Sequence, residues 1–544
     1  MPFRPLPNRP SLELDKKSAK RLLRQARALD EAALARIAAH HPRFSRPEQI
    51  APSALRLADV ELVLAREYGF ASWPRYKHFV ETLLTDRASR AATLTQAVCS
   101  NQLSRGATLL EREPALARFD LYTACSCGEL SFVEAALARE PSAATRAGGA
   151  NGWQPLVYCC FSRFWRGDPE RARGLLGIAQ ALLARGADPN AHFLIQHDQH
   201  LLAQTCLYAA AGIANNAELT ALLLRAGADV DERVQAETPS DSRASAEPLR
   251  DWLRRYPLEA LYHASEFKDV ACLRLLLEAK PNPRSVSYCL GRALDFAQET
   301  AAFLFLEHGA DPRFVMPWAG HRSHLHKAVE NGRSAQLIRS MLQRGADPNL
   351  NDESSLSPYR EAVRSGNPEV AALLEEFGAD RRAVTEQDRL LGALSSGQSE
   401  RRPGLAPDAH LLARAARRND LPTIKRLLAA GVDVNAMLDV PPLHAACYAG
   451  HLAAAQLLYE SGASLTQKNA HGGTPLGTCI YGSQDCCDEQ GGPGTLSAEE
   501  IPARDYADLT AWLIERGAEL PDSIWGGSEA VQEVLRRHGV KDIG

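Results

Sequence analysis

The chain has 544 residues, and its composition favours short, closely packed helices over sheets. Aromatic residues make up only 6% of it, and 62 lysine and arginine residues against 66 aspartate and glutamate residues give a net charge of −4. This balance excludes the strongly positive field that a general nucleic-acid-binding protein needs. We find neither a secretion signal nor an apolar stretch typical of a membrane span, so we expect a cytoplasmic protein. We also expect it to bind neither nucleic acid nor a membrane.

The first 90 residues predict a helical region that differs from everything after it. Apolar residues at helical spacing predict four helices, over residues 16–29, 31–40, 55–68 and 73–84. An array of repeats needs an end unit whose outer face is polar. We therefore interpret residues 1–90 as a helical N-terminal cap.

Further along the chain, glycines that end predicted helices recur at regular intervals. They are Gly186, Gly227, Gly309, Gly345, Gly378, Gly431, Gly462 and Gly517. The intervals 309 to 345, 345 to 378 and 431 to 462 are 36, 33 and 31 residues long. Self-similarity with a period of about 33 residues indicates a repeat protein, and we count about eleven units.

One stretch rich in Ser, Gly and Pro interrupts this array. It contains a stunted helix over residues 385–394 and a connector that ends at Pro407. We therefore predict an N-terminal repeat stack at 91–380, a linker with the stunted helix at 381–407, and a C-terminal repeat stack at 408–520.

The end of the chain, residues 521–544, predicts one more helix. Ser528 is a good N-cap for a helix over 529–537. We place Glu533 and Arg536 on the outer, solvent-facing side of this helix, together with Arg537, and interpret the segment as a C-terminal capping helix.

The clearest repeat unit is residues 440–466, with the sequence VPPLHAACYAGHLAAAQLLYESGASLT. Pro442 suits the first position of a helix, and Gly450 ends that helix. A second helix over 452–460 ends at Gly462. Two antiparallel helices this short cannot bury their apolar faces alone, so the unit requires neighbouring copies of itself.

This unit resembles the ankyrin repeat, whose helical signature is T-P-L-H-x-A-A-x-x-G-H followed by L-L-x-x-G-A-D. The matching residues are Pro442-Leu443-His444-Ala445-Ala446, Gly450-His451, Leu457-Leu458 and Gly462-Ala463. The resemblance implies an all-α fold, an ankyrin-type α-solenoid of stacked helix-turn-helix repeats with helical N- and C-terminal caps. Pro441 stands where the family has Thr, so we expect the first helix to lack its hydroxyl cap.

Residues 57–75 resemble the N-terminal segment of a group of bacterial ankyrin-repeat proteins, with Phe70 and Trp73 as the expected core anchors. The order of the later units is also similar to that group, so the resemblance extends over nearly the whole chain. It implies a fold and a bacterial source, but not an activity.

The motifs of catalysis are absent from the sequence. It contains no G-x-S-x-G, G-x-x-x-x-G-K-[ST], H-E-x-x-H or zinc-finger spacing. The 12 cysteines include no C-x-x-C pair, and we interpret them as reduced, mostly core residues. We therefore predict a protein that is not an enzyme and has no cofactor and no metal.

Two groups of histidines leave one alternative open. They are His192, His197 and His200 in one inter-repeat loop, and His321, His324 and His326 in another. A zinc site needs three or four ligands that converge on the ion. The ankyrin resemblance instead implies that His326 and His444 make hydrogen bonds between turns. Structural roles are the favoured reading, with a metal-dependent site as the alternative.

Five aromatic residues are the predicted partner-binding residues: Trp153, Phe161, Trp165, Phe193 and Trp318. Aromatic side chains dominate binding energy at protein interfaces, and Phe193 and Trp318 fall in inter-repeat fingers that ought to be polar. The competing interpretation is that these side chains fold back and cover the ends of helices.

We thus predict a non-catalytic protein–protein interaction scaffold, expected to be a monomer, that binds an unknown protein through the concave face and finger loops of the solenoid. A translocated effector that binds a host protein through the same surface is an alternative of a different kind. The sequence does not distinguish the two.

Overall fold

The computed structural model describes residues 11–44, 46–70, 72–84, 86–100, 102–197, 200–233, 258–295, 298–316, 321–398, 408–483, 506–524 and 526–542. Most of these residues are helical, which confirms the predicted all-α class. The chain divides into two compact units. The smaller comprises Met1–Thr93, Leu520–Trp525 and Glu529–Gly544, and the larger comprises Leu94–Glu519 and Gly526–Ser528.

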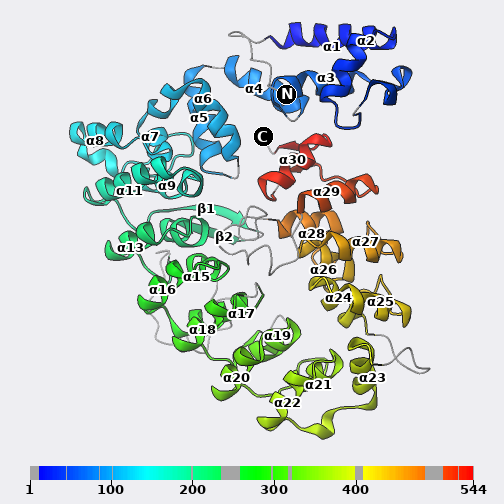
Figure 1. Ribbon diagram of the computed structural model, residues 1–544. Helices are drawn as coiled ribbons and strands as arrows, with labels where there is room; N and C mark the ends of the chain where they lie inside the picture. The colour runs from blue at the N-terminus through cyan, green and yellow to red at the C-terminus, as the bar shows by residue number, and fades with distance from the viewer. Residues whose placement is uncertain are drawn as a thin grey trace. The chain divides into compact units, whose positions relative to one another are not determined.

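Pairs of short helices build the first part of the larger unit (Figure 1). In chain order the pairs are α5 (Arg87–Val98) and α6 (Leu103–Arg112), α7 (Leu121–Cys127) and α8 (Leu130–Arg139), α9 (Pro155–Cys160) and α11 (Pro169–Leu183) with the short α10 (Phe164–Gly167) between them, α12 (Cys206–Tyr208) with η5 (Ala209–Ile213) and α13 (Ala217–Arg225), α15 (Glu259–Ala264) and α16 (Ala271–Glu278), α17 (Pro283–Asp295) and α18 (Glu299–Glu307), α19 (His324–Glu330) and α20 (Ala335–Gln343), and α21 (Pro358–Arg364) and α22 (Pro368–Glu376).

A single helix, α23 (Glu386–Ser395), follows these pairs and confirms the predicted stunted helix. The pairs then resume as α24 (Ala409–Arg417) and α25 (Leu421–Ala429), α26 (Pro442–Tyr448) and α27 (Leu452–Glu460), and α28 (Pro475–Gly482) and α29 (Tyr506–Glu515). Short 3-10 turns in the larger unit are η3 (Pro114–Arg118), η4 (Pro141–Ala144) and η7 (Arg381–Ala383). Helix α23 packs between α21 and α25, so the stacking continues through the predicted linker.

The glycines singled out in the sequence do end helices. All eight have positive φ, from 83° at Gly186 to 97° at Gly227. Glycine reaches this left-handed region without a steric penalty because it has no Cβ. Lys280, at the corresponding place in its own repeat, also has a positive φ, of 59°. The spacing of these glycines in the sequence is therefore the spacing of the helix pairs in the structure.

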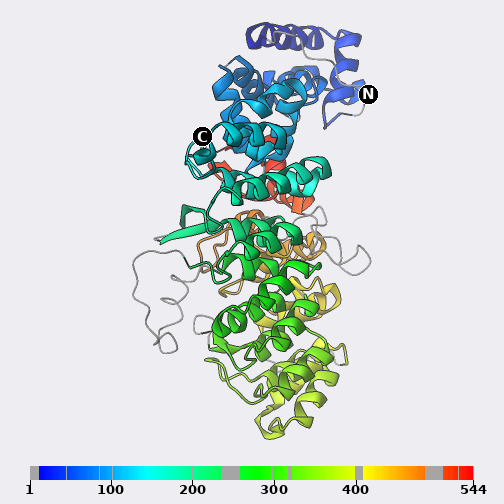
Figure 2. The same cartoon turned by 90° about the vertical axis from the view of Figure 1, so that its left-hand side faces the viewer.

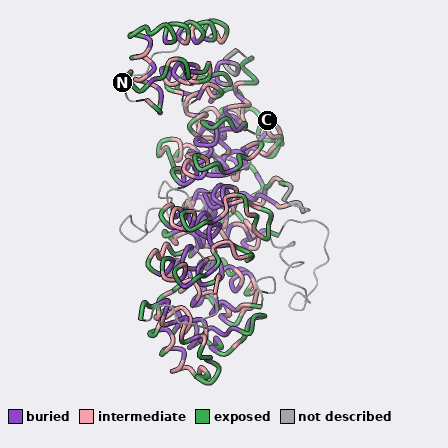
Figure 3. Tube along the Cα trace, turned by 90° about the vertical axis from the view of Figure 1, so that its right-hand side faces the viewer, coloured by how far each residue is buried: buried purple, intermediate pink, exposed green. Residues whose placement is uncertain are grey.

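The core of the larger unit runs along the first helices of the pairs, which pack on one another from repeat to repeat. In α26, for example, Leu443, Ala446 and Cys447 are buried, as the apolar stripe predicted. Figure 3 shows buried residues along the middle of the trace and exposed residues at its edges. Each repeat thus uses its neighbours to bury its apolar face.

Short β-ladders accompany the helices. An antiparallel hairpin of β1 (His192–His197) and β2 (His200–Thr205) projects beyond the helical stack (Figure 2). A second antiparallel pair, β3 (Val315–Met316) and β4 (Arg322–Ser323), lies between α18 and α19 in the chain. We expected residues 192–200 to lie in an inter-repeat loop. The segment does lie between repeats, and the apolar run after His192 pairs with residues 200–205 to form a hairpin.

The smaller unit contains the four helices predicted for the N-terminal region. They are α1 (Leu12–Arg27), α2 (Glu31–His40), α3 (Leu57–Glu67) and α4 (Trp73–Leu84), with the short turns η1 (Pro47–Gln49) and η2 (Pro52–Ala54). The expected core anchors Phe70 and Trp73 both contact the ring of Tyr76, with centroids 5.5 and 5.3 Å away. The unit also holds α30 (Glu529–Arg537), β5 (Ser523–Ile524) and β6 (Lys541–Asp542).

Helix α30 has the predicted bounds, but its predicted orientation is wrong. Glu533 and Arg536 are buried rather than facing solvent. Glu533 forms an ion pair of 2.5 Å with Arg75 of α4. Helical periodicity distinguishes the polar face of a helix from its apolar face. It does not show that Arg75, far away in the sequence, pairs with Glu533 on that polar face.

Candidate functional site

Three of the predicted binding residues form one aromatic cluster at the base of the β1–β2 hairpin. The rings of Trp153 and Phe193 are stacked, with centroids 4.2 Å apart and an angle of 18° between their planes. Phe161 packs edge-on against Phe193 at 4.9 Å, and its centroid is 6.1 Å from that of Trp153. Phe161 is buried, while Trp153 and Phe193 are partly exposed. Such pairs contribute beyond the area they bury.

The other two predicted residues do not join this cluster. Trp165 is buried, and its indole Nε1 donates a hydrogen bond to the carbonyl of Cys159 at 2.9 Å. It is therefore a core residue in this structure. Trp318 lies outside the described residues. Its role, and the role of the other four in binding, stay predictions.

The aromatic cluster continues along the first helices of successive repeats. One tyrosine from each of α7, α9, α12, α15 and α17 takes part: Tyr122, Tyr158, Tyr208, Tyr262 and Tyr288. Neighbouring rings along this row, with His263 between the third and fourth tyrosine, have centroids 4.2–6.4 Å apart. We call these rings, with Trp153, Phe161 and Phe193, the aromatic row. The regular placement of tyrosine in first helices was a signal that the sequence analysis missed.

The hairpin adds apolar side chains that face solvent. Leu194 is 51% exposed and Ile195 is 37% exposed, although both are large and hydrophobic. The support beneath the hairpin is rigid, because the Tyr158 hydroxyl donates to the Gly148 carbonyl at 2.9 Å and accepts from the amide of Asn151 at 2.7 Å. A rigid base that carries a hairpin with exposed apolar residues along its first strand is suited to binding a partner.

Further along the stack, the inner surface is occupied by the chain's own ion pairs. Arg414 of α24 pairs with Glu330 of α19, at 3.0 Å, and with Glu361 of α21. Arg322 also contacts Glu330, and its Nε is 3.0 Å from a carboxylate oxygen of Asp352. Residues 53 to 84 positions apart in sequence are thus joined directly. Helices that precede and follow α23 in the chain therefore contact one another through this network.

A second set of charges lies beside the first. Asp295 of α17 pairs with Lys327 at 2.8 Å and with Arg417 of α24 at 3.6 Å. The Arg417 guanidinium also lies over the ring of Tyr448, 5.6 Å from its centroid. Between α17, α19 and α24 the inner face is therefore an internal contact, not a free binding surface.

Within this network, the pKa values of the two glutamates shift in opposite directions. Burial by itself raises the pKa of Glu330, but the charges of Arg414 and Arg322 outweigh burial and lower this pKa to about 2. Burial lowers the pKa of Arg414, and Glu361 and Glu330 more than restore it, so its pKa is raised. The pKa of Glu361 is raised, because burial outweighs its attraction to Arg414.

The second group of histidines and His444 make hydrogen bonds, whereas the side chains of His197 and His200 lie outside the described part of the structure. The ring of His326 contacts the Leu356 carbonyl at 3.1 Å, and that of His444 contacts the Gly473 carbonyl at 2.9 Å, which confirms the predicted bonds between turns. His324 contacts the Ser287 carbonyl, and His321 contacts Glu353. In the described ranges, no three His, Cys, Asp or Glu side chains are arranged to hold a metal ion.

The described cysteines are buried and free, as expected of small core residues. Burial raises their thiol pKa values, to about 11 at Cys272 and about 12 at Cys127. Thiols with raised pKa values are poor nucleophiles. Cys486 and Cys487 lie outside the described residues. Within the described part of the chain, no helix has the length and apolar character needed to cross a membrane.

Two family models match parts of the chain. One, described as "Ankyrin repeats (3 copies)", matches residues 412–489, and the other, described as "Ankyrin repeat", matches residues 204–234. These matches agree with the helix pairs, the period and the signature residues described above. The chain is an ankyrin-repeat protein.

Other similarities of this ankyrin-repeat protein are partial. It is 31% identical over 137 residues to "Ankyrin repeat protein nuc-2" of Neurospora crassa, a match that covers 25% of this chain and 11% of that protein. The chain therefore spans about one ninth of that relative. A solved structure, "Crystal structure of human ASB11 ankyrin repeat domain", is 20% identical, with a TM-score of 0.21 and coverage of 46% of this chain and 97% of that one.

Proposed function

We infer that this ankyrin-repeat protein is a non-catalytic binding module for another protein, and that the β1–β2 hairpin with the adjacent aromatic row is its binding surface. The observation that carries this proposal is the exposure of Leu194 and Ile195 directly beyond the stacked rings of Trp153 and Phe193. Interface hot spots are enriched in aromatic residues on rigid supports.

The ion-pair network supports the same location. It fills the inner face between α17, α19 and α24, so a partner cannot use that part of the concave surface without displacing these charge pairs. The hairpin and the part of the aromatic row near it carry no such obstacle.

The test is an affinity capture with the full-length protein and a Leu194→Asp/Ile195→Asp variant. Captured proteins are identified by mass spectrometry, purified and titrated against both forms. We expect the purified partner to bind the wild type, and the variant to lose at least tenfold in affinity, because two charges would be buried against an apolar surface.

Met437→Asp provides the control, since Met437 is an exposed hydrophobic residue on a different repeat. Its affinity should equal that of the wild type. The location of the site is disproved if a purified partner binds the Leu194→Asp/Ile195→Asp variant as tightly as the wild type.

A further inference from the structure

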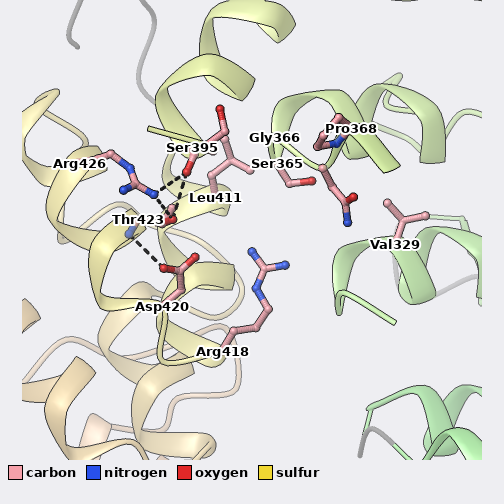
Figure 4. Close-up of a pocket in the computed structure, with 12 residues that line it drawn as sticks. Val329, Ser365, Gly366, Pro368, Ser395, Leu411, Arg418, Asp420, Thr423 and Arg426 are labelled. Atoms are coloured by element: carbon pink, nitrogen blue, oxygen red, sulfur yellow. Dashed lines mark hydrogen bonds between the residues drawn. The ribbon is translucent and has the colours of Figure 1, made fainter. Parts of the chain in front are cut away.

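The larger unit contains a polar cavity of about 360 Å³ where α22, α23, α24 and α25 meet (Figure 4). Its walls come from the α21–α22 turn, the end of α23, and the facing sides of α24 and α25. This volume lies within the range of about 300–1,000 Å³ that is usual for small-molecule sites. The cavity is separate from the hairpin and the aromatic row.

Arg418, at the C-terminal end of α24, lines the cavity and is solvent-accessible. Figure 4 shows its side chain extending toward the wall that carries Val329 and Pro368. One of its terminal nitrogens donates to the carbonyl of Glu330 at 3.3 Å. A guanidinium has five N–H donors in a planar fork, so this single long bond leaves most of them available to a ligand.

A second guanidinium lies on the opposite side of the cavity. Arg426 donates to the carbonyl of Ser395 at 2.6 Å and to the hydroxyl of Thr423 at 2.9 Å. Its Nε is buried and makes no hydrogen bond with the residues that the structure describes. Because buried donors are normally paired, this nitrogen is an unsatisfied donor of a residue that lines the cavity.

The remaining wall groups also favour an anion. The Oδ1 atom of Asn367 accepts a hydrogen bond from the amide of Val370, which leaves the NH₂ group of this side chain as a donor. Asp420 is the acidic residue of the wall, but one of its carboxylate oxygens caps α25 by accepting from the amide of Thr423 at 3.1 Å. The NH₂ group of Asn367 and the guanidinium of Arg418 are therefore both available as donors.

Burial and neighbouring charges both act on Arg418. Burial and Arg414 lower its pKa, whereas Asp420, Glu361 and Glu330 raise it. Burial also lowers the pKa of the nearby Arg333, to about 10; Glu299 and Asp295 oppose this shift, whereas Arg417 and Arg418 add to it.

We propose that this cavity binds a small anion that carries a carboxylate or phosphate group, held in a bidentate manner by Arg418 and contacted by Arg426 and Asn367. Paired N–H donors of arginine match the geometry of both groups. The proposal assigns the protein a small-molecule site in addition to its surface for a protein partner, and neither depends on the other.

Isothermal titration calorimetry on the full-length protein tests this proposal, with citrate and inorganic phosphate as separate probes in chloride buffer of matched ionic strength. We expect saturable binding of one equivalent of at least one probe. Citrate binding alone would identify a carboxylate ligand, and phosphate binding alone a phosphate ligand. If the wild type binds neither probe saturably, the proposal is wrong.

Variants locate the site. Arg418→Gln should weaken binding of the probe at least tenfold, whereas Arg418→Lys, which keeps the charge but loses the fork, should weaken it less. Arg185→Gln is the matched control, because Arg185 is exposed on another repeat and bonds only to its own helix. Circular dichroism shows whether each variant folds. If Arg418→Gln does not fold, the comparison is made with Arg418→Lys alone. Equal affinity of the wild type and both Arg418 variants would overturn the assignment.

Discussion

Glu232 illustrates how one residue ties two repeats together. Its carboxylate accepts hydrogen bonds from the hydroxyl of Thr205 and, at 2.6 Å, from the amide of Ala260 at the start of α15. The side chain is almost fully buried. Burial raises its pKa to about 8, although both hydrogen bonds favour the charged form. The free energy that Glu232 contributes to the contact between these two repeats therefore depends on pH.

This pKa predicts a pH-dependent stability that Glu232→Gln should remove. The folded-state pKa of about 8 lies above the unfolded value of about 4.3, so the stabilising contribution is complete below the unfolded value and is lost as the pH rises through 8. From pH 5 to pH 9, the wild type should lose roughly 4 kcal/mol in unfolding free energy relative to the variant. Urea denaturation of both proteins at both pH values measures this, and a constant difference would refute it.

At the scale of the element, each repeat is fixed to the next by side chains at the start of its first helix. Thr474 caps α28 by accepting from the amide of Gly477, while α26, which begins after Pro441, has no side-chain cap, as the sequence predicted. His444 of α26 compensates by bonding to the carbonyl of Gly473, just before α28. The signature histidine thus connects consecutive first helices.

His444→Ala should therefore destabilise the C-terminal repeats. The substitution removes a buried ring and leaves a carbonyl unpaired, which together cost about 2–3 kcal/mol. Chemical denaturation followed by the fluorescence of Trp512 in α29, in a variant whose other tryptophans are replaced by phenylalanine, measures the change. His471→Ala is the control, because His471 is exposed, and it should shift stability by less than about 0.5 kcal/mol. Similar losses for both variants would contradict the role given to His444.

At the scale of the whole molecule, the ion-pair network decides which surface is free. Arg414 joins α24 to α19 and α21, so repeats from both sides of the predicted linker contact each other directly. The predicted domain boundaries at 380 and 408 stay predictions. Helix α30 adds a second long-range contact, because it belongs to the same compact unit as the N-terminal helices.

Arg414→Ala should cost about 3–5 kcal/mol in unfolding free energy, because Glu361 would remain buried without its partner and Glu330 would keep only Arg322. Adding Glu361→Gln to this variant should recover part of the loss by removing one unpaired charge. Guanidinium denaturation compares these variants with Arg344→Ala, an exposed arginine whose hydrogen bonds stay within α20. A loss at Arg414 no larger than that at Arg344 would show that the network does not hold the repeats together.

The sequence by itself determined the local structure of this protein. Helices 31–40, 452–460 and 529–537 have the predicted bounds, the glycines end helices where the period placed them, and the signature histidines make the expected bonds. Periodicity, capping and the positive φ of glycine act over a few residues, so they can be read from a short stretch of chain.

Only the tertiary structure decided which surfaces are free. It placed Trp165 in the core, aligned the tyrosines of five first helices beside Phe193, buried Glu533 against Arg75, and brought Arg414 to Glu330. Except for the bond of Trp165, these contacts join residues far apart in the sequence, and no local sequence pattern encodes them.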